Sequence, residues 1–165
     1  MSSGISPQQC RETVARILAD EITALKLLET LLRSEHTHLA ENDIDALETA
    51  SAARQDCVAR LSRLGDERRD LCRMLGRGPD LAGLAALVAW CDPSGTLAPL
   101  LAEHAQRSTD CRDQNARNGA LVGARMARIS NMLGMLSGSV TPPVYGRGGQ
   151  QAPTPTAGRL LAARA

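Results

Sequence analysis

Aromatic residues are almost absent from this sequence: its 165 residues include one Trp, one Tyr and no Phe. The strands of β-sandwiches and barrels draw on aromatic and β-branched residues, so the shortage argues against an all-β fold. It also argues against the aromatic platforms on which proteins stack single-stranded nucleic acid. Hydrophobic residues nonetheless make up 43% of the chain and charged residues 22%, which favours a folded core over general disorder.

Neither a targeting segment nor a membrane-spanning segment is expected. The N-terminus has no basic stretch followed by an apolar block, so no signal peptide is expected, and no apolar run approaches the ~20 residues that cross a bilayer. The cysteines are odd in number and form no C-x-x-C pair, which favours free thiols over disulfides or a metal site. They are Cys10, Cys57, Cys72, Cys91 and Cys111. We therefore expect a soluble, cytoplasmic protein without stable membrane insertion.

A dense basic region of the kind that binds duplex DNA is also lacking. The formal net charge is +1, and the last 27 residues carry three arginines and no acidic residue. A partial row of arginines between residues 107 and 128 is interleaved with Asp110 and Asp113. A helical DNA-binding regulator is therefore a weak alternative, and no nucleic acid is expected as a partner.

Helix-forming residues are abundant, since Ala, Leu, Arg, Glu and Lys together make up nearly half of the chain. Ser6 can cap a first helix, and Pro7 fits the first helical position because its missing N–H costs nothing there. Leucines then recur every seven residues, with Val14 and Leu28 between them, which predicts one long helix from about 7 to 40 with a single packing face. The repeating leucines are Leu18, Leu25, Leu32 and Leu39.

A short acidic link separates the first helix from a second, which Asn42 or Asp43 can cap. Such a short link favours an antiparallel hairpin. The second helix should end before the segment Gly76–Pro79, since Gly suits a helix end and Pro cannot continue a helix. Its predicted buried face consists of Ile44, Leu47, Val58, Leu61, Leu71 or Cys72, and Leu75.

The remaining pattern predicts a short helix, a third long helix and a tail. Asp80 should cap the short helix, from Leu81 to about Cys91, which should bury Leu84, Leu87 and Trp90. Thr96 should open the third long helix, which tolerates Pro99 in its first turn and stops near Ser137–Gly138. Its predicted face is Leu97, Leu101, His104, Cys111, Asn115, Asn118, Val122, Ile129, Met132 and Leu136.

The predicted fold class is therefore all-α: an elongated antiparallel helical hairpin, a short helix and a third long helix. Residues 1–138 form the helical domain. Residues 139–165 are rich in Pro and Gly, a composition that cannot form a core, so they are predicted to be a disordered, flexible C-terminal tail.

Catalysis has no support in the sequence, so the protein is not expected to be an enzyme, and no cofactor or metal is expected. Residues 35–38 contain one Glu-x-x-His spacing, but a di-metal helical bundle needs a second one that the chain does not have, so a solvated helix surface is favoured. Glu21 and Glu35 fall on the apolar face of the first helix. Either that face meets solvent there, or the two carboxylates pair with arginines such as Arg54, Arg68 or Arg125.

The last long helix holds an unusual number of interior glycines, each of which costs roughly 1 kcal/mol relative to Ala. Gly119, Gly123 and Gly134 lie close to Asn115 and Asn118. The glycines either allow close helix packing or keep the helix marginal, so that it can shift or repack around a partner.

Several segments in this order resemble the FlgN family of flagellar type III export chaperones. They are LETLLRSEHTHL at residues 28–39, ENDIDAL at 41–47, Trp90, the run Asn115-Ala-Arg-Asn118-Gly119-Ala-Leu, and Tyr145-Gly146-Arg147-Gly148-Gly149. The resemblance covers roughly residues 14–149. It implies the same elongated helical fold and makes Asn115, Asn118 and Gly119 a family motif.

The resemblance also implies a function. The protein would bind hook–filament junction proteins of the FlgK and FlgL type, prevent their premature association and deliver them to the flagellar export gate, with components of the export ATPase complex as further partners. Tyr145 and Gly146 would dock at the gate. The client would lie on a stripe of the last long helix, here called the C-terminal stripe: Leu121, Val122, Arg125, Ile129, Met132, Leu133 and Leu136. Two alternatives stay open: the stripe is internal core, or the protein is a coiled-coil adaptor that only oligomerises.

Overall fold

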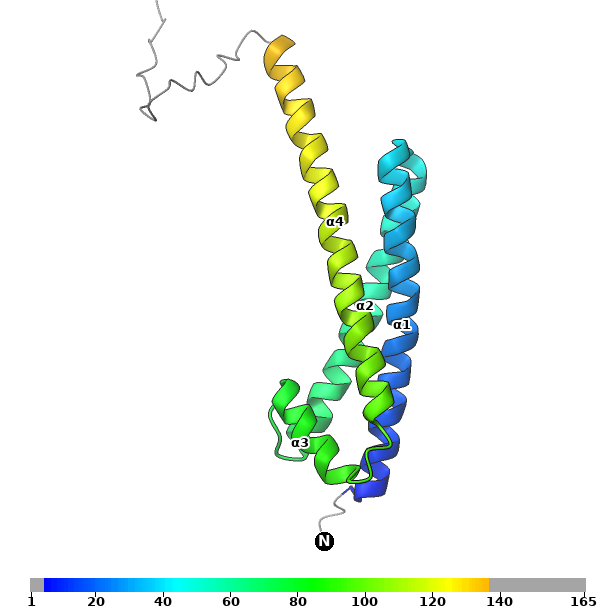
Figure 1. Ribbon diagram of the computed structural model, residues 1–165, viewed down its shortest axis with the longest axis vertical. Coiled ribbons are helices and arrows are strands. Elements are labelled where there is room, and N and C mark those ends of the chain that lie inside the picture. Colours follow the sequence, from blue (N-terminus) through cyan, green and yellow to red (C-terminus); the bar gives the residue numbers. More distant parts are fainter. Residues whose placement is uncertain (1–4, 137–165) are drawn as a thin grey trace, which may run out of the picture. The chain divides into compact units, whose positions relative to one another are not determined.

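The computed structural model describes residues 5–136, and four helices account for most of that range. They are α1 (Pro7–Glu41), α2 (Ile44–Met74), α3 (Leu81–Cys91) and α4 (Ala98–Leu136), shown in Figure 1. The described residues contain no strand, so the all-α prediction is confirmed. The predicted tail, 139–165, lies outside the described residues.

The chain divides into two compact units, residues 1–126 and 127–165. The first unit contains α1, α2, α3 and α4 as far as Met126. The described part of the second unit is the end of α4, residues 127–136.

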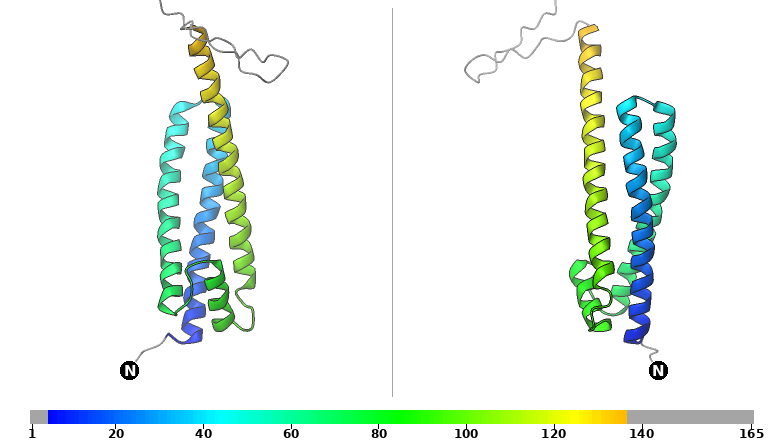
Figure 2. Two further views of the ribbon diagram at one scale, coloured as in Figure 1. Left: turned by 90° about the vertical axis from the view of Figure 1, so that its left-hand side faces the viewer. Right: turned by 45° about the vertical axis from the view of Figure 1, so that its right-hand side comes forward.

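The predicted caps set the ends of the first two helices. Ser6 Oγ accepts from the Gln9 N–H at 3.2 Å, and the Gln9 side chain accepts from the Ser6 N–H at 3.0 Å, a reciprocal capping box ahead of Pro7. Asn42 ends α1 in the left-handed conformation, and Asp43 caps α2 by accepting from the Ala46 N–H. Two residues thus reverse the chain, and α1 and α2 form the predicted antiparallel hairpin (Figures 1 and 2).

The main apolar core lies where the N-terminal half of α1 meets the end of α2, α3 and the start of α4. Trp90 was predicted to be buried there, but it is 39% exposed, and Cys91 is buried in its place. A smaller cluster further along α1 joins Leu25 and Leu32 to Cys111 of α4. The main core consists of Cys10, Val14, Ile17, Leu18, Leu71, Cys72, Leu84, Leu87, Cys91 and Leu97.

The predicted buried face of α2 is wrong at Ile44 and Val58. Ile44 is 75% exposed and Val58 is also exposed, whereas the small residues Ala50, Cys57 and Gly65 are buried. The Cys57 thiol donates to the backbone carbonyl of Ala24 at 3.2 Å, a contact that requires close approach of α2 to α1. At Cys57 α2 approaches α1 through a small side chain, whereas the neighbouring Val58 is exposed.

Both carboxylates on the α1 face are buried and paired with the predicted arginines. Arg68 Nε lies 3.3 Å from one oxygen of Glu21, and Arg54 Nε lies 2.7 Å from Glu35. His104 Nε2 lies 3.0 Å from the second oxygen of Glu21. The expectation of a solvent-facing position is therefore wrong for Glu21 and Glu35, because each carboxylate has a cation reaching it from a neighbouring helix.

The start of α4 differs from the prediction by two residues, since the helix begins at Ala98 rather than at Thr96. The buried carboxylate of Asp92 explains this: one oxygen accepts from the Thr96 hydroxyl at 2.6 Å, and the other accepts from the Leu97 N–H at 2.7 Å. These hydrogen bonds hold Thr96 and Leu97 in the loop. Pro99 lies in the first turn, as predicted.

All five cysteines are buried free thiols. Burial raises the pKa of Cys10 to about 12, with neighbouring Cys91 and Cys72 adding to the effect, and burial also raises the pKa of Cys57, Cys72 and Cys111. Because the thiolate is the reactive form, these residues serve as small packing groups. Among residues 5–136, no group of side chains is arranged to hold a metal ion. None of the described helices is long and apolar enough to cross a membrane.

Candidate functional site

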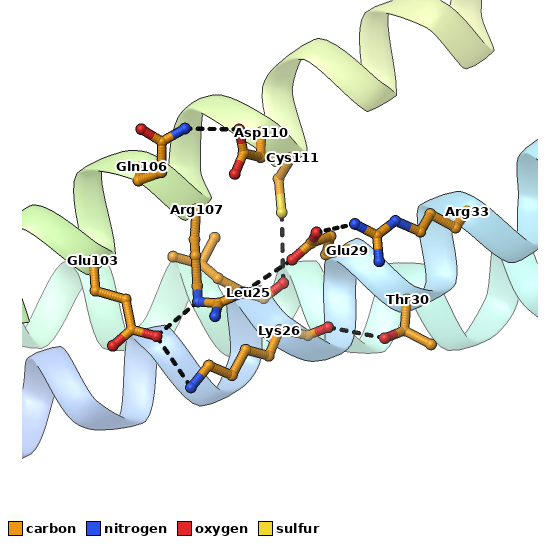
Figure 3. Close-up of polar contacts among 10 residues, drawn as sticks. All are labelled: Leu25, Lys26, Glu29, Thr30, Arg33, Glu103, Gln106, Arg107, Asp110 and Cys111. Carbon is orange, nitrogen blue, oxygen red and sulfur yellow. Dashed lines mark hydrogen bonds and ion pairs between the residues drawn. The ribbon is translucent and has the colours of Figure 1, made fainter.

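Within the first unit, α4 runs beside α1 in the same direction. Lys26 lies 3.1 Å from Glu103, and Arg107 lies 3.0 Å from Glu29. Figure 3 shows both ion pairs between the two helices. Arg107 and Lys26 hydrogen-bond to Glu103 and lower the pKa of its carboxyl. Partly exposed pairs of this kind contribute little stability each, so their main effect is to fix the register of α4 along α1.

Asn118 makes a buried polar contact between α4 and α1. It is 5% exposed, and its amide nitrogen donates to the Leu32 carbonyl at 2.8 Å. Its side-chain oxygen lies 3.0 Å from His36 Nδ1 and accepts from Gln114 at 3.2 Å. A buried amide with its donor and acceptor both satisfied fixes one geometry, because an unpaired partner would cost about 1–3 kcal/mol.

A groove of about 290 Å³ lies beside Asn118, between α1, α2 and α4. All three residues of the predicted family motif line it, together with Val122 of the C-terminal stripe. The paired Glu35 and Arg54 form part of its wall. The complete lining is Glu35, Leu39, Leu47, Ser51, Arg54, Asn115, Asn118, Gly119 and Val122. The motif thus combines one buried anchor, Asn118, with two exposed positions at an opening between helices.

The glycines near this groove do not serve close packing. A side-chain carbon built on Gly119 or Gly123 would meet no atom within 4 Å. The prediction of close helix packing is therefore wrong for these two residues. The alternative, that the glycines keep this part of α4 marginal, remains a prediction.

Most of the C-terminal stripe is exposed among the described residues. Ile129 is 51% exposed and Leu136 is 85% exposed, and Val122, Met132 and Leu133 are exposed as well. Leu121 and Arg125 are half-buried, and Arg125 donates to the Ala40 carbonyl at 3.4 Å. Beyond Asn118, α4 therefore presents a row of large apolar side chains with nothing covering it among the described residues.

The sequence prediction of the site was incomplete in two respects. It placed Leu39 and Leu47 on packing faces but did not bring them together with Asn115 and Gly119 around a groove. It also assigned residues 35–38 to a solvated surface, whereas Glu35 is buried against Arg54 and His36 contacts Asn118. Tyr145 and Gly146, predicted to dock at the export gate, lie outside the described residues.

The described part of α4 thus presents an exposed apolar row with a groove beside its first turn. A family model described as FlgN protein matches residues 11–153, which is most of the chain. No curated protein and no solved structure matches the sequence.

Proposed function

Since this chain belongs to the FlgN family of flagellar export chaperones, we propose that it binds hook-associated proteins of the FlgK and FlgL type. It holds these clients in the cytoplasm, keeps their terminal helices from associating prematurely and delivers them to the flagellar export gate, where components of the export ATPase complex are further partners. The family is one of chaperones rather than enzymes, and the chain acts by binding alone.

The observation that carries this proposal is the exposed C-terminal stripe of α4. Large apolar patches on a soluble protein typically mark interaction sites. The stripe repeats at the spacing with which an amphipathic client helix lays its own apolar face into a hydrophobic surface. Met126, Met132 and Met135 are also exposed, and methionine adapts its shape to more than one client.

Ile129→Asp is expected to weaken client binding by about tenfold or more, because it places an unpaired charge in an apolar contact. The folded protein itself should lose little stability, since Ile129 is already half exposed. Co-purification of the full chain with a FlgK-type protein measures binding, and circular dichroism melting measures stability. Ala124→Asp is the matched control, because Ala124 is exposed on the opposite side of the same helix.

A large loss of melting temperature in Ile129→Asp, with binding lost in proportion, would contradict the proposal, because it would show that the stripe supports the fold. Failure of the unaltered chain to retain any hook-associated protein, together with concentration-dependent self-association, would favour the adaptor that only oligomerises.

Tyr145 is proposed as the anchor at the export gate, on the evidence of the sequence resemblance and because it is the only Tyr in the chain. Tyr145→Ala should leave folding and client affinity nearly unchanged, since distant sites usually act independently. It should weaken binding to the gate by roughly thirtyfold and impair motility. A Phe replacement should restore part of the binding if ring burial dominates. Equal gate binding by Tyr145→Ala and the unaltered chain would exclude this role.

A further inference from the structure

The charge of α4 changes along its length. Its first half mixes acidic and basic residues, ending with Asp113. From residue 114 to the end of the sequence there is no Asp or Glu. The only charged residues of α4 in this range are Arg117, Arg125 and Arg128, and none of them makes an ion pair within residues 5–136.

Two of these arginines run along one edge of the exposed apolar row. Val122, Met126, Ile129, Leu133 and Leu136 alternate in steps of four and three, so they share one face of α4. At 3.6 residues per turn, Arg125 and Arg128 fall together on one side of that face. The opposite side carries Gly119, Gly123 and Ser130, which are small and uncharged.

We propose that the partner of this surface is an amphipathic helix that carries Asp or Glu along one edge of its apolar face. The apolar residues of the partner cover the row, and its carboxylates face Arg125 and Arg128. This inference rests on the proposed function, because it takes the surface of α4 to be the client surface. Complementary charge at the edge of an apolar contact speeds encounter and rejects partners of the wrong sign.

Two other occupants fit the observations less well. A second copy of the chain would bring only arginines to the contact, with no carboxylate in this segment to offset their repulsion. Nucleic acid would require a denser set of cations, and the large apolar row between the arginines offers phosphates nothing. An acidic helix uses both the apolar row and its basic edge.

The test compares two synthetic amphipathic peptides binding to the full chain. They share the same apolar residues, and one has Glu and the other Lys along one edge. The Glu peptide should bind about tenfold more tightly at about 50 mM salt, and the preference should shrink at about 300 mM because salt screens exposed charges. Arg125→Glu combined with Arg128→Glu should reverse the preference. Arg112→Glu is the matched control, because Arg112 is an exposed α4 arginine outside this surface with no ion pair among the described residues.

Each contrary result overturns the inference. Equal binding of the two peptides would do so, as would binding of neither peptide by a chain that retains a hook-associated protein, or an equal effect of Arg112→Glu. Displacement of the Glu peptide by random-sequence duplex DNA at similar concentration would point to nucleic acid instead. If the peptide preference holds but no hook-associated protein is retained, the proposed function fails and the acidic-helix specificity stands.

Discussion

Arg68→Met is expected to lower the free energy of unfolding by about 3 kcal/mol, because it leaves the buried carboxylate of Glu21 without its guanidinium partner. Glu21 is 3% exposed, and Arg68 reaches it from α2 while His104 reaches it from α4. The remaining contact with His104 cannot replace the lost hydrogen bond to the first carboxylate oxygen. Urea unfolding followed by circular dichroism gives the loss directly.

An exposed ion pair on the same helix supplies the control. Arg73 pairs with Asp70 in α2 at 2.7 Å, and both side chains are more than half exposed. Arg73→Met should therefore change the unfolding free energy by less than about 0.5 kcal/mol. The double variant Glu21→Met with Arg68→Met should recover much of the stability lost in Arg68→Met, because a well-packed apolar pair can replace a buried ion pair. Equal losses in Arg68→Met and Arg73→Met would show that the buried pair has no special role.

The same carboxylate makes stability depend on pH. Burial alone would raise the pKa of Glu21, but the neighbouring His104 and Arg68 more than offset this effect and hold the pKa below its ordinary value. A carboxyl with a lowered pKa in the folded state stabilises the protein above its unfolded pKa, and this stabilisation is lost as the pH falls below about 4. Arg68→Met should therefore show a weaker loss of stability between about pH 5 and pH 2 than the unaltered chain.

The sequence predicts helix ends best where a side chain bonds to the backbone of a residue only a few positions away. Ser6 and Pro7 define the start of α1, and Asp43 defines the start of α2, because each cap is a contact within three residues. The leucines at 18, 25, 32 and 39 were predicted correctly as a buried face for a related reason. Helical periodicity depends only on local geometry.

The sequence does not predict correctly which residues of α2 are buried where the buried residues are small. Hydrophobicity favours Ile44 and Val58 for the buried face of α2, but Ala50, Cys57 and Gly65 are buried instead. Of these three, Cys57 reaches the Ala24 carbonyl of α1. Periodicity cannot reveal how close two helices come, because that distance depends on both partners.

The candidate site also depends on contacts between helices, which sequence periodicity cannot predict. The apolar row of α4 can be found from spacing, but spacing does not tell an exposed row from a buried one. Asn118 looks like any other polar residue on a helix until its contacts with Leu32 and His36 are known. The groove beside it combines residues from three helices, so no local pattern in the sequence could have indicated it.

The second substitution with a large expected effect is Gly83→Ala. Helix propensity predicts that it raises the free energy of unfolding, whereas the structure predicts that it lowers it. Gly83 lies in the first turn of α3, and an Ala at an interior helix position normally stabilises by up to about 1 kcal/mol. Here a side-chain carbon would lie 1.7 Å from the backbone carbonyl oxygen of Gly78. The loop before α3 would have to move, which would also disturb the cap in which Asp80 accepts from the Gly83 N–H at 2.8 Å.

Gly83→Ala is therefore expected to lower the unfolding free energy by about 3 kcal/mol, measured by urea unfolding. Gly119→Ala is the matched control: it makes the same chemical change in α4, where a side-chain carbon meets nothing within 4 Å. It should raise the unfolding free energy by about 1 kcal/mol. If both variants gain stability, the loop before α3 yields to a methyl group at little cost. If both lose stability, Gly119 is not in open space, and α4 packs closely against its neighbours beside the groove.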